Sequence, residues 1–164
     1  MNNTQGFKTA DLCDDYAECL QIAEPGYRHY GGISKFYGEI STVKCFEDNS
    51  MVRQQLSTPG RGRVLVVDAG GSRRCAMLGD LLAAMAIQNG WRGIIMHGMI
   101  RDSEDIAQMP VGVMALGTHP KKSEKQGIGD IDIAVNFAGI CFQPGEQVYA
   151  DHDGIIVAQQ PLIE

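Results

Sequence analysis

The sequence has no pair of cysteines spaced as C-x-x-C, no long apolar run and no excess of positive charge. Its five cysteines are Cys13, Cys19, Cys45, Cys75 and Cys141. Because their number is odd and the spacing is absent, reduced thiols in a core are favoured over a disulfide framework, and a zinc tetrathiolate site is excluded. No apolar run approaches the ~20 residues that a helix needs to cross a bilayer. We therefore expect a soluble protein with no membrane partner.

The N-terminal stretch, residues 1–10, is polar, carries a single basic residue at Lys8 and contains no apolar segment. It therefore does not resemble a secretory signal peptide. Together with the unpaired cysteines, this predicts a cytoplasmic protein.

Charge and length limit the function further. Lys and Arg number 14 against 20 Asp and Glu, which gives a net charge of -6. A negative molecule repels phosphate backbones, so direct nucleic-acid binding is disfavoured. The 164 residues, of which 44% are hydrophobic and 21% charged, suit one folded domain over residues 1–164.

The hydrophobic pattern alternates strands with helices and then changes to short strands. Thr9 is expected to cap a first helix that Pro25-Gly26 stops, and Asp48 or Asn49 to cap a short second helix. Strands are expected over residues 39–47, 64–67, 93–97, 113–116, 131–137, 140–142, 148–150 and 155–157, with helices over 79–89 and 103–109. The charged segment 121–130 has no periodicity and is expected to be a solvated loop. This order predicts a mixed α/β sandwich with a β-rich C-terminal third.

A glycine-rich turn, Gly70-Gly71, follows the apolar run Val64–Val67. Nucleotide and methyl-donor sites are often built at such strand ends. The G-x-G-x-x-G fingerprint is absent, because Ser72-Arg73-Arg74-Cys75 follows the glycine pair. A simple turn is therefore favoured, and an S-adenosylmethionine methyltransferase is a distant alternative.

The pair Gly79-Asp80 is separated from the pair Arg101-Asp102 by twenty residues that read as an apolar helix and an apolar strand. This spacing places the N-terminus of the helix and the carboxyl end of the strand at one rim of the fold. Both pairs can then face one ligand. The alternative is structural, with Asp80 complementing the helix dipole and Arg101-Asp102 forming a solvated charged turn.

Each of these residues has a chemistry that suits a small carboxylic acid. The unpaired N–H groups of Leu81 and Leu82 at the helix start favour an anion, and Arg101 offers a planar fork for a carboxylate. Asp102 is a hard oxygen ligand of the kind that Mg²⁺ accepts while it keeps several waters. Asp80 can orient one of those waters and pass protons.

At these residues the sequence resembles the metal-dependent 4-hydroxy-4-methyl-2-oxoglutarate (HMG) aldolases. The rest of the chain is similar to the related RraA proteins, which are named as regulators of ribonuclease E activity. The matching stretches are 38–49 (GEISTVKCFEDN), 61–71 (RGRVLVVDAGG), 127–139 (GIGDIDIAVNFAG) and 149–156 (YADHDGII). The resemblance extends from about Thr9 to the end of the chain.

The resemblance implies a compact α/β/α-type sandwich of the swivelling-domain type with a mixed sheet, assembled as a homotrimer or a dimer of trimers with sites between subunits. It maps the pyruvyl contacts to Gly79–Leu82 and Arg101, the metal ligand to Asp102, and catalytic roles to Arg101 and Asp80. RraA-type regulators characteristically lack the metal-binding carboxylate, so its presence here favours catalysis. Longer aldolases have additional C-terminal sequence that reaches a neighbour's site, whereas this sequence ends at Glu164, so the proton donor is not identified.

The implied activity is that of a class II pyruvate aldolase, a carbon-carbon lyase that uses Mg²⁺ or Mn²⁺. It would cleave HMG to two pyruvates and decarboxylate oxaloacetate through the same pyruvate enolate. No lysine stands out in a buried apolar setting, and Lys44 is expected to keep its head in water, so an imine mechanism is disfavoured. The alternative is a protein that binds and inhibits ribonuclease E.

Three other groups are assigned structural roles. His97 lies four residues before Arg101, and a hydrogen-bonded core or rim histidine is favoured over a role in the site. The triplet Asp151-His152-Asp153 is interpreted as a hairpin turn with Asp153-Gly154 at its apex, and not as a metal site. Arg73-Arg74 is interpreted as a solvated basic spot.

Overall fold

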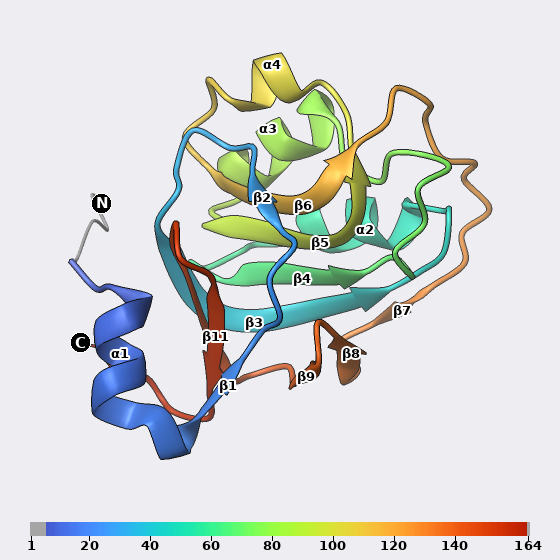
Figure 1. Cartoon of the computed structure of the whole chain (residues 1–164). Coiled ribbons are helices and arrows are strands. Elements are labelled where there is room, and N and C mark those ends of the chain that lie inside the picture. Colours follow the sequence, from blue (N-terminus) through green and yellow to red (C-terminus); the bar gives the residue numbers. More distant parts are fainter. Residues whose placement is uncertain (1–5, 164) are drawn as a thin grey trace.

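Figure 1 shows the computed structural model, which describes residues 6–163. Residues 1–5, which belong to the polar N-terminal stretch, and residue 164 lie outside the described residues. The elements follow in the order α1 (Thr9–Tyr16), η1 (Ala17–Cys19), β1 (Leu20–Ile22), β2 (Arg28–His29), β3 (Phe36–Lys44), α2 (Ser50–Leu56), β4 (Val64–Asp68), α3 (Asp80–Gln88), β5 (Gly93–Ile100), α4 (Ser103–Ile106), β6 (Gly112–Thr118), β7 (Asp130–Ile131), β8 (Val135–Phe137), β9 (Ile140–Phe142), β10 (Gln147–Ala150) and β11 (Ile155–Ala158).

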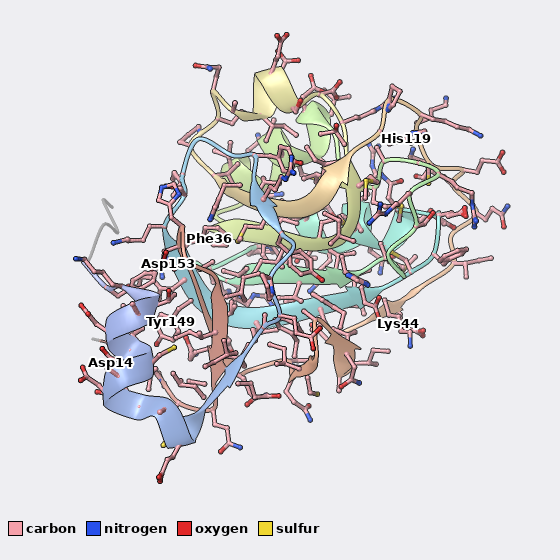
Figure 2. All side chains as sticks on the ribbon, viewed as in Figure 1. Asp14, Phe36, Lys44, His119, Tyr149 and Asp153 are labelled. Carbon is pink, nitrogen blue, oxygen red and sulfur yellow. The ribbon has the colours of Figure 1, made fainter. Side chains whose placement is uncertain are left out.

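Four parallel strands, β3, β4, β5 and β6, form the centre of the structure, and one helix lies in each connection between them. The run Val64–Val67 of β4 is fully buried, as expected for a parallel strand that is covered on both faces. Parallel strands end at the same edge of a sheet. Figure 2 shows this edge through Lys44, at the end of β3, and His119, just after β6, which lie at the same side of the molecule.

The sheet is mixed because antiparallel strands extend it on both sides. Its order is β1-β11-β10-β3-β4-β5-β6-β2, and β7 pairs with the end of β3. The C-terminal strands β10 and β11 form a hairpin that joins β3. The mixed α/β class, the mixed sheet and the β-rich C-terminal third are thereby confirmed. The short strands β1 and β2 were not expected from the sequence.

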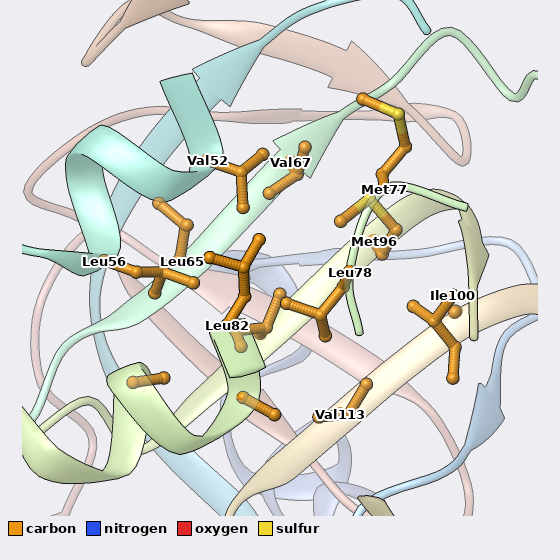
Figure 3. Close-up of a cluster of buried hydrophobic side chains, with 14 of the residues drawn as sticks. Val52, Leu56, Leu65, Val67, Met77, Leu78, Leu82, Met96, Ile100 and Val113 are labelled. Atoms are coloured by element: carbon orange, nitrogen blue, oxygen red, sulfur yellow. The ribbon is translucent and has the colours of Figure 1, made fainter. Parts of the chain in front are cut away.

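One face of the central strands packs against α2, α3 and α4. Figure 3 shows this cluster, in which Val52 and Leu56 of α2 and Leu82 of α3 lie against Leu65 and Val67 of β4. All of these side chains are buried, which removes their apolar surface from water and stabilises the helix-sheet contact.

The opposite face is covered by strands. The hairpin β8–β9 packs Phe137 and Phe142 against the central sheet, together with side chains of β10 and β11. Helix α1 packs on the outer side of the β10–β11 hairpin, where Phe7 and Leu12 form a buried cluster with Tyr149. Helices therefore lie on two sides of the β structure, with α1 set apart from α2, α3 and α4 in Figure 1.

The close approach of Phe36 to two neighbouring strands explains two glycines of the sheet. A Cβ atom at Gly93 of β5 or at Gly112 of β6 would overlap the Phe36 ring. Both positions therefore require glycine for steric reasons, because a packed interior has no room for an added methyl group.

The prediction that Thr9 caps the first helix is wrong. Lys8 occupies the N-cap of α1, without a side-chain cap. The Thr9 hydroxyl and backbone N–H instead donate to the two carboxylate oxygens of Asp151, each at 2.7 Å. A buried carboxylate needs donors, and these two bonds tie α1 to the β10–β11 turn.

The single strand expected over residues 131–137 is also wrong, because Asp132 divides it into β7 and β8. Asp132 has a left-handed backbone (φ 54°), which interrupts a strand. Its Oδ1 accepts from Ser41 Oγ at 2.7 Å and from Thr42 N at 3.2 Å. These contacts hold the bend against β3.

The helix pattern predicts a cap at Ser103 and an inward Leu81, and the structure shows neither. Ser103 is the first residue of α4, and Asp102 is its N-cap, without a side-chain bond. In α3, Leu82 is buried but Leu81 is 80% exposed, since successive helix residues point in different directions. Strand β5 runs on to Ile100, three residues beyond its expected end.

All five cysteines lie in the described structure as free thiols, as expected, but only Cys45 and Cys75 are buried in the core. Within residues 6–163, no helix has the length and apolar character that crossing a bilayer requires.

Candidate active site

The two segments singled out in the sequence meet beyond the carboxyl end of β5. The segment that leads into α3 runs beside this end, where Arg101 N donates to Leu78 O at 2.9 Å. The first N–H of α3, that of Asp80, donates to Asp102 Oδ2 at 3.0 Å. Residues twenty-two positions apart thus share one rim, and their roles in binding or catalysis stay predictions.

Asp102 has an unusual backbone conformation. Its φ and ψ angles are 58° and 38°, in the left-handed region that few residues other than glycine adopt and that Asp tolerates better than most. This conformation turns the chain between β5 and α4 and directs the carboxylate to the N-terminus of α3. There the positive end of the helix dipole favours a negative charge. Strained residues of this kind cluster at functional sites.

The absence of a side chain at Gly79 lets the Asp102 carboxylate approach the N-terminus of α3. A Cβ atom at Gly79 would lie 2.8 Å from Asp102 Oδ2 and 3.5 Å from Arg101 Nε. Its φ angle of −128° is open to any residue, so the requirement for glycine is one of space. A side chain here would displace the Asp102 carboxylate and would contact Arg101.

The two leucines at the start of α3 contribute differently. Their backbone N–H groups have no partner one turn earlier in the helix, which leaves a site of partial positive charge. The side chain of Leu82 belongs to the core, whereas that of Leu81 stands in solvent. Substrate binding through these residues would therefore use the backbone.

These residues line a cavity of about 110 Å³, enough for several water molecules or a three-carbon acid. Its lining consists of Asn49, Arg53, Ala76, Leu78, Gly79, Asp80, Leu81, Leu82, Arg101, Asp102, Lys122, Ser123 and Lys125. Four of these side chains are cationic and two are carboxylates. The cavity therefore suits an anion of more than one negative charge.

Sequence reasoning missed the wall formed by Asn49, Arg53, Lys122, Ser123 and Lys125. Asn49 was expected only as a helix cap, and the loop 121–130 only as solvated. The loop is indeed largely exposed, but buried Ser123 donates to Asn49 Oδ1 at 2.9 Å. The positive charge of the loop was the only available signal, and it did not indicate which surface the loop would cover.

The donor set for a metal ion is small. Among residues 6–163, no group of three or more His, Cys, Asp or Glu side chains is placed to hold one. Asp102 is exposed and has one carboxylate oxygen outside the hydrogen bond to Asp80. One carboxylate with substrate and water fits Mg²⁺ or Mn²⁺, which bind hard oxygens and keep waters, and does not fit a four-ligand zinc site.

His97 lies on the other face of the sheet, away from this cavity. Its ring stacks on Phe137 with centroids 4.7 Å apart, and its Nδ1 shares a hydrogen bond of 2.7 Å with the Tyr27 hydroxyl. Burial lowers the pKa of His97, while the charge of Asp68 acts in the opposite direction. The interpretation as a hydrogen-bonded structural histidine is confirmed.

The other polar groups also have structural surroundings. Asp151-His152-Asp153 lies in the turn between β10 and β11, where Asp151 N donates to Gly154 O at 3.1 Å, which confirms the hairpin. Arg74 is exposed and forms an ion pair with Glu47. Lys44 is exposed at the end of β3, as expected.

A family model described as RraA-like, Aldolase/RraA, matches residues 9–157. The chain belongs to this family. A relative from Laribacter hongkongensis is 56% identical over 96% of this chain and 99% of its own length, and one from Azotobacter vinelandii is 55% identical over 95% and 96%. Both carry the provisional name 4-hydroxy-4-methyl-2-oxoglutarate aldolase.

Solved structures of RraA-like relatives share the fold. The RNA-processing inhibitor RraA from Thermus thermophilus superposes with a TM-score of 0.93 at 39% identity, over 97% of this chain and 96% of its own. A protein from Geobacillus kaustophilus described as an S-adenosylmethionine:2-dimethylmenaquinone methyltransferase gives 0.94 at 52% identity, over 95% and 97%. Three different activities are thus attached to one RraA-like fold, and only the site of this chain can decide among them.

Proposed function

We propose that this chain is a divalent-metal-dependent pyruvate aldolase that cleaves HMG to two pyruvates and decarboxylates oxaloacetate as a second activity. The observation that carries the proposal is the contact of Asp102 with the N-terminus of α3, beside Arg101 and in one small cavity. The names of the RraA-like relatives support a lyase. The metal dependence and the second activity are what the resemblance to the HMG aldolases implies, and the residues of the cavity are compatible with both.

The proposed binding mode follows from the donors of the cavity. Arg101 donates two parallel hydrogen bonds to the carboxylate of the pyruvyl unit, and the N–H groups of Leu81 and Leu82 face its negative charge. Arg101 is half-buried and, within residues 6–163, makes no side-chain hydrogen bond, so its donors are available. Holding the unit in one orientation lowers the entropic part of the barrier.

The reaction breaks the C3–C4 bond of the substrate. In HMG, the C4 hydroxyl loses its proton and becomes the keto group of the second pyruvate, while the electron pair of the broken bond forms an enolate. In oxaloacetate, CO₂ leaves and the same enolate remains. A proton returned to C3 then gives pyruvate. Arg101 and the N-terminus of α3 stabilise the negative charge that develops on the enolate.

Asp102 would hold the divalent ion, and Asp80 would orient a water and pass protons beside it. Such an ion, when bound, supplies Lewis-acid stabilisation of the developing negative charge, which is worth several kcal/mol. The carboxylate of Asp102 thus has two tasks, because one oxygen orders the start of α3 and the other stays free for the ion.

The wall that contains the other cationic side chains favours a substrate with a second carboxylate. Arg53, Lys122 and Lys125 line it, and all three are exposed. HMG and oxaloacetate both carry two carboxylates, one at each end. We propose that the pyruvyl end lies at Arg101 and the distal carboxylate faces the cationic wall.

The experiment is to incubate the purified protein with HMG or oxaloacetate and Mg²⁺ or Mn²⁺ and to measure pyruvate. We expect release from both substrates and its loss on addition of a chelator. Matched samples that receive chelator followed by excess metal control for damage to the protein. The absence of pyruvate from both substrates under all metal conditions would overturn the proposal.

A second candidate function is regulation of an RNA-processing enzyme such as ribonuclease E, favoured by the likeness to the Thermus inhibitor. The presence of Asp80, Arg101 and Asp102 favours the aldolase over the regulator. A methyltransferase is not proposed, because the Gly70-Gly71 turn is filled: Cβ atoms there would lie 2.7 Å from the Phe46 ring and 3.2 Å from His97 Nε2.

We also propose a homotrimer or a dimer of trimers, located in the cytoplasm. Leu81, Phe46 and Ile128 are large apolar side chains that are 80%, 57% and 63% exposed, and association would remove them from water. Leu81 lines the cavity, so an interface there would lie beside the site. Sedimentation velocity would measure the assembly, and a monomer at all concentrations would contradict this proposal.

A further inference from the structure

The loop 121–128 lines part of the cavity through Lys122, Ser123 and Lys125, and it buries no apolar side chain. All of its residues are exposed except Ser123. A loop without buried apolar side chains is ordinarily mobile, since burial does not offset the entropy lost on ordering it. Its position over the cavity therefore depends on hydrogen bonds from elsewhere in the fold.

Two of these bonds are accepted by Asp48, which precedes α2. Its carboxylate is buried, with the residue 5% exposed. Oδ1 accepts from Ser50 N at 2.9 Å and from Ser50 Oγ at 2.5 Å. Oδ2 accepts from the backbone N–H groups of Gln126 at 2.9 Å and Ile128 at 3.0 Å. One carboxylate thus orders the start of a helix and fixes a loop nearly eighty residues away.

The two residues after Asp48 add to the same connection. Ser50 Oγ accepts from Gly127 N at 3.1 Å. Asn49 accepts from Ser123 through Oδ1, and its Nδ2 donates to Met77 O at 3.1 Å, in the segment that leads to Gly79. Residues 48–50 therefore hold the loop from Ser123 to Ile128 and link it to the segment that carries the start of α3, while Ala76 N donates to Lys121 O at 2.7 Å and fixes its beginning.

We infer that Asp48 is a positioning residue which sets specificity for the distal carboxylate of the substrate, by holding Lys122 and Lys125 over the cavity. This inference rests on the proposed function. Asp48 does not line the cavity, so it acts through the loop and touches no substrate. Both lysines lie within or beside the stretch that Ser123, Gln126 and Ile128 fix.

For Asp48→Asn, the loss of negative charge and the loss of loop positioning predict opposite changes in substrate binding. Removing a negative charge near two lysines makes the cavity more positive, which by itself would tighten the binding of a dianion. Replacing a carboxylate oxygen by an NH₂ group removes an acceptor that holds the loop, and a freed loop would weaken the binding of the dianion. The sign of the change in KM therefore separates positioning from simple electrostatics.

The test compares Asp48→Asn with Glu124→Gln, which removes one negative charge from the same loop without removing any of the loop-holding bonds. For Asp48→Asn we expect KM for HMG to rise about tenfold with kcat changed less than about twofold, the pattern of lost uniform binding. Inhibition by pyruvate, which has no distal carboxylate, should change less than about twofold. For Glu124→Gln we expect KM unchanged or lower. An unchanged or lower KM in Asp48→Asn would overturn the inference.

Amide hydrogen exchange provides a readout that does not depend on turnover. Asp48→Asn should raise exchange at residues 121–128 and leave that of β4 and β5 unchanged. Ser50→Ala, which removes two bonds and keeps the carboxylate, serves as a milder variant should Asp48→Asn fold poorly, with a smaller rise in exchange and in KM. Faster exchange with unchanged KM would refute the specificity role alone, whereas an inactive wild-type protein would refute the proposed function and with it this inference.

Discussion

The two walls of the cavity are built by different kinds of bond. The wall of Gly79, Asp80, Arg101 and Asp102 is fixed by a helix and a parallel strand, through the backbone bond of Arg101 N to Leu78 O and the bond of Asp80 N to the Asp102 carboxylate. The wall of loop 121–128 is fixed by side chains of residues 48–50, which accept from the Ser123 hydroxyl and from the backbone N–H groups of Gln126 and Ile128. We expect the first wall to move only with the sheet, and one substitution to loosen the second. Under the proposed function, reaction and specificity would then depend on supports of different stability.

The largest effect is expected in the first wall, for Asp102→Asn. Asn tolerates the left-handed conformation and can still accept the Asp80 N–H through its carbonyl, so the protein should stay folded. The anionic ligand is lost, and we expect kcat/KM to fall on the order of 10²- to 10³-fold. Steady-state pyruvate release with Mg²⁺ measures the loss.

Asp105→Asn is the matched control, because it removes an exposed carboxylate in α4 three residues away. It should leave kcat/KM within about twofold of the wild type. Equal losses in both variants, or none in Asp102→Asn, would contradict the assignment of Asp102.

The next effect is expected for Gly79→Ala. The added Cβ would lie 2.8 Å from Asp102 Oδ2, so the carboxylate must shift, while the backbone angle stays allowed for alanine. We expect kcat/KM to fall on the order of 10- to 100-fold, because small displacements of catalytic groups are costly. Thermal unfolding should change by only a few degrees. Gly6→Ala, whose Cβ would meet nothing within 4 Å, is the control, and full activity of Gly79→Ala would show that this approach is not required.

The contrast between the walls also explains what could be predicted from the sequence. The run Val64–Val67 and the spacing of Asp80 and Asp102 are local patterns, and they placed the central strands and the first wall correctly. The second wall depends on bonds between Asp48 and Ile128, which are eighty residues apart. No periodicity encodes such a pair. Thr9 failed as a cap for the same reason, since Asp151 competes for its hydroxyl.

A smaller effect is expected for Arg101→Lys. Lysine keeps the charge but cannot donate two parallel hydrogen bonds to one carboxylate. We expect KM for HMG and the inhibition constant of pyruvate to rise together by about tenfold, because both molecules contain the pyruvyl carboxylate. Arg53→Lys in the other wall should affect HMG alone and less strongly. A rise confined to HMG in Arg101→Lys would place the distal carboxylate, and not the pyruvyl one, at Arg101.

The smallest effect concerns the pH dependence of the stability that Asp48 contributes through the second wall. Burial opposes the charged form of Asp48, but hydrogen bonds from Ser50, Ile128 and Gln126 outweigh it and lower its pKa to about 2. An unfolded Asp has a pKa of about 3.9. Because the folded pKa is the lower one, the ionised carboxylate stabilises the fold above pH ~4, and this contribution is lost as the pH falls toward 2.

Asp48→Asn isolates this contribution, because a protonated Asp48 and an asparagine are both neutral. The difference in free energy of unfolding between wild type and variant should be constant above pH ~5 and shrink as the pH falls from about 4 toward 2. Urea unfolding at a series of pH values measures it, and other acidic groups cancel in the difference because both proteins contain them. A difference that stays constant down to pH ~2.5 would mean that the carboxylate is not held as an anion by the loop, and the second wall would then need another support.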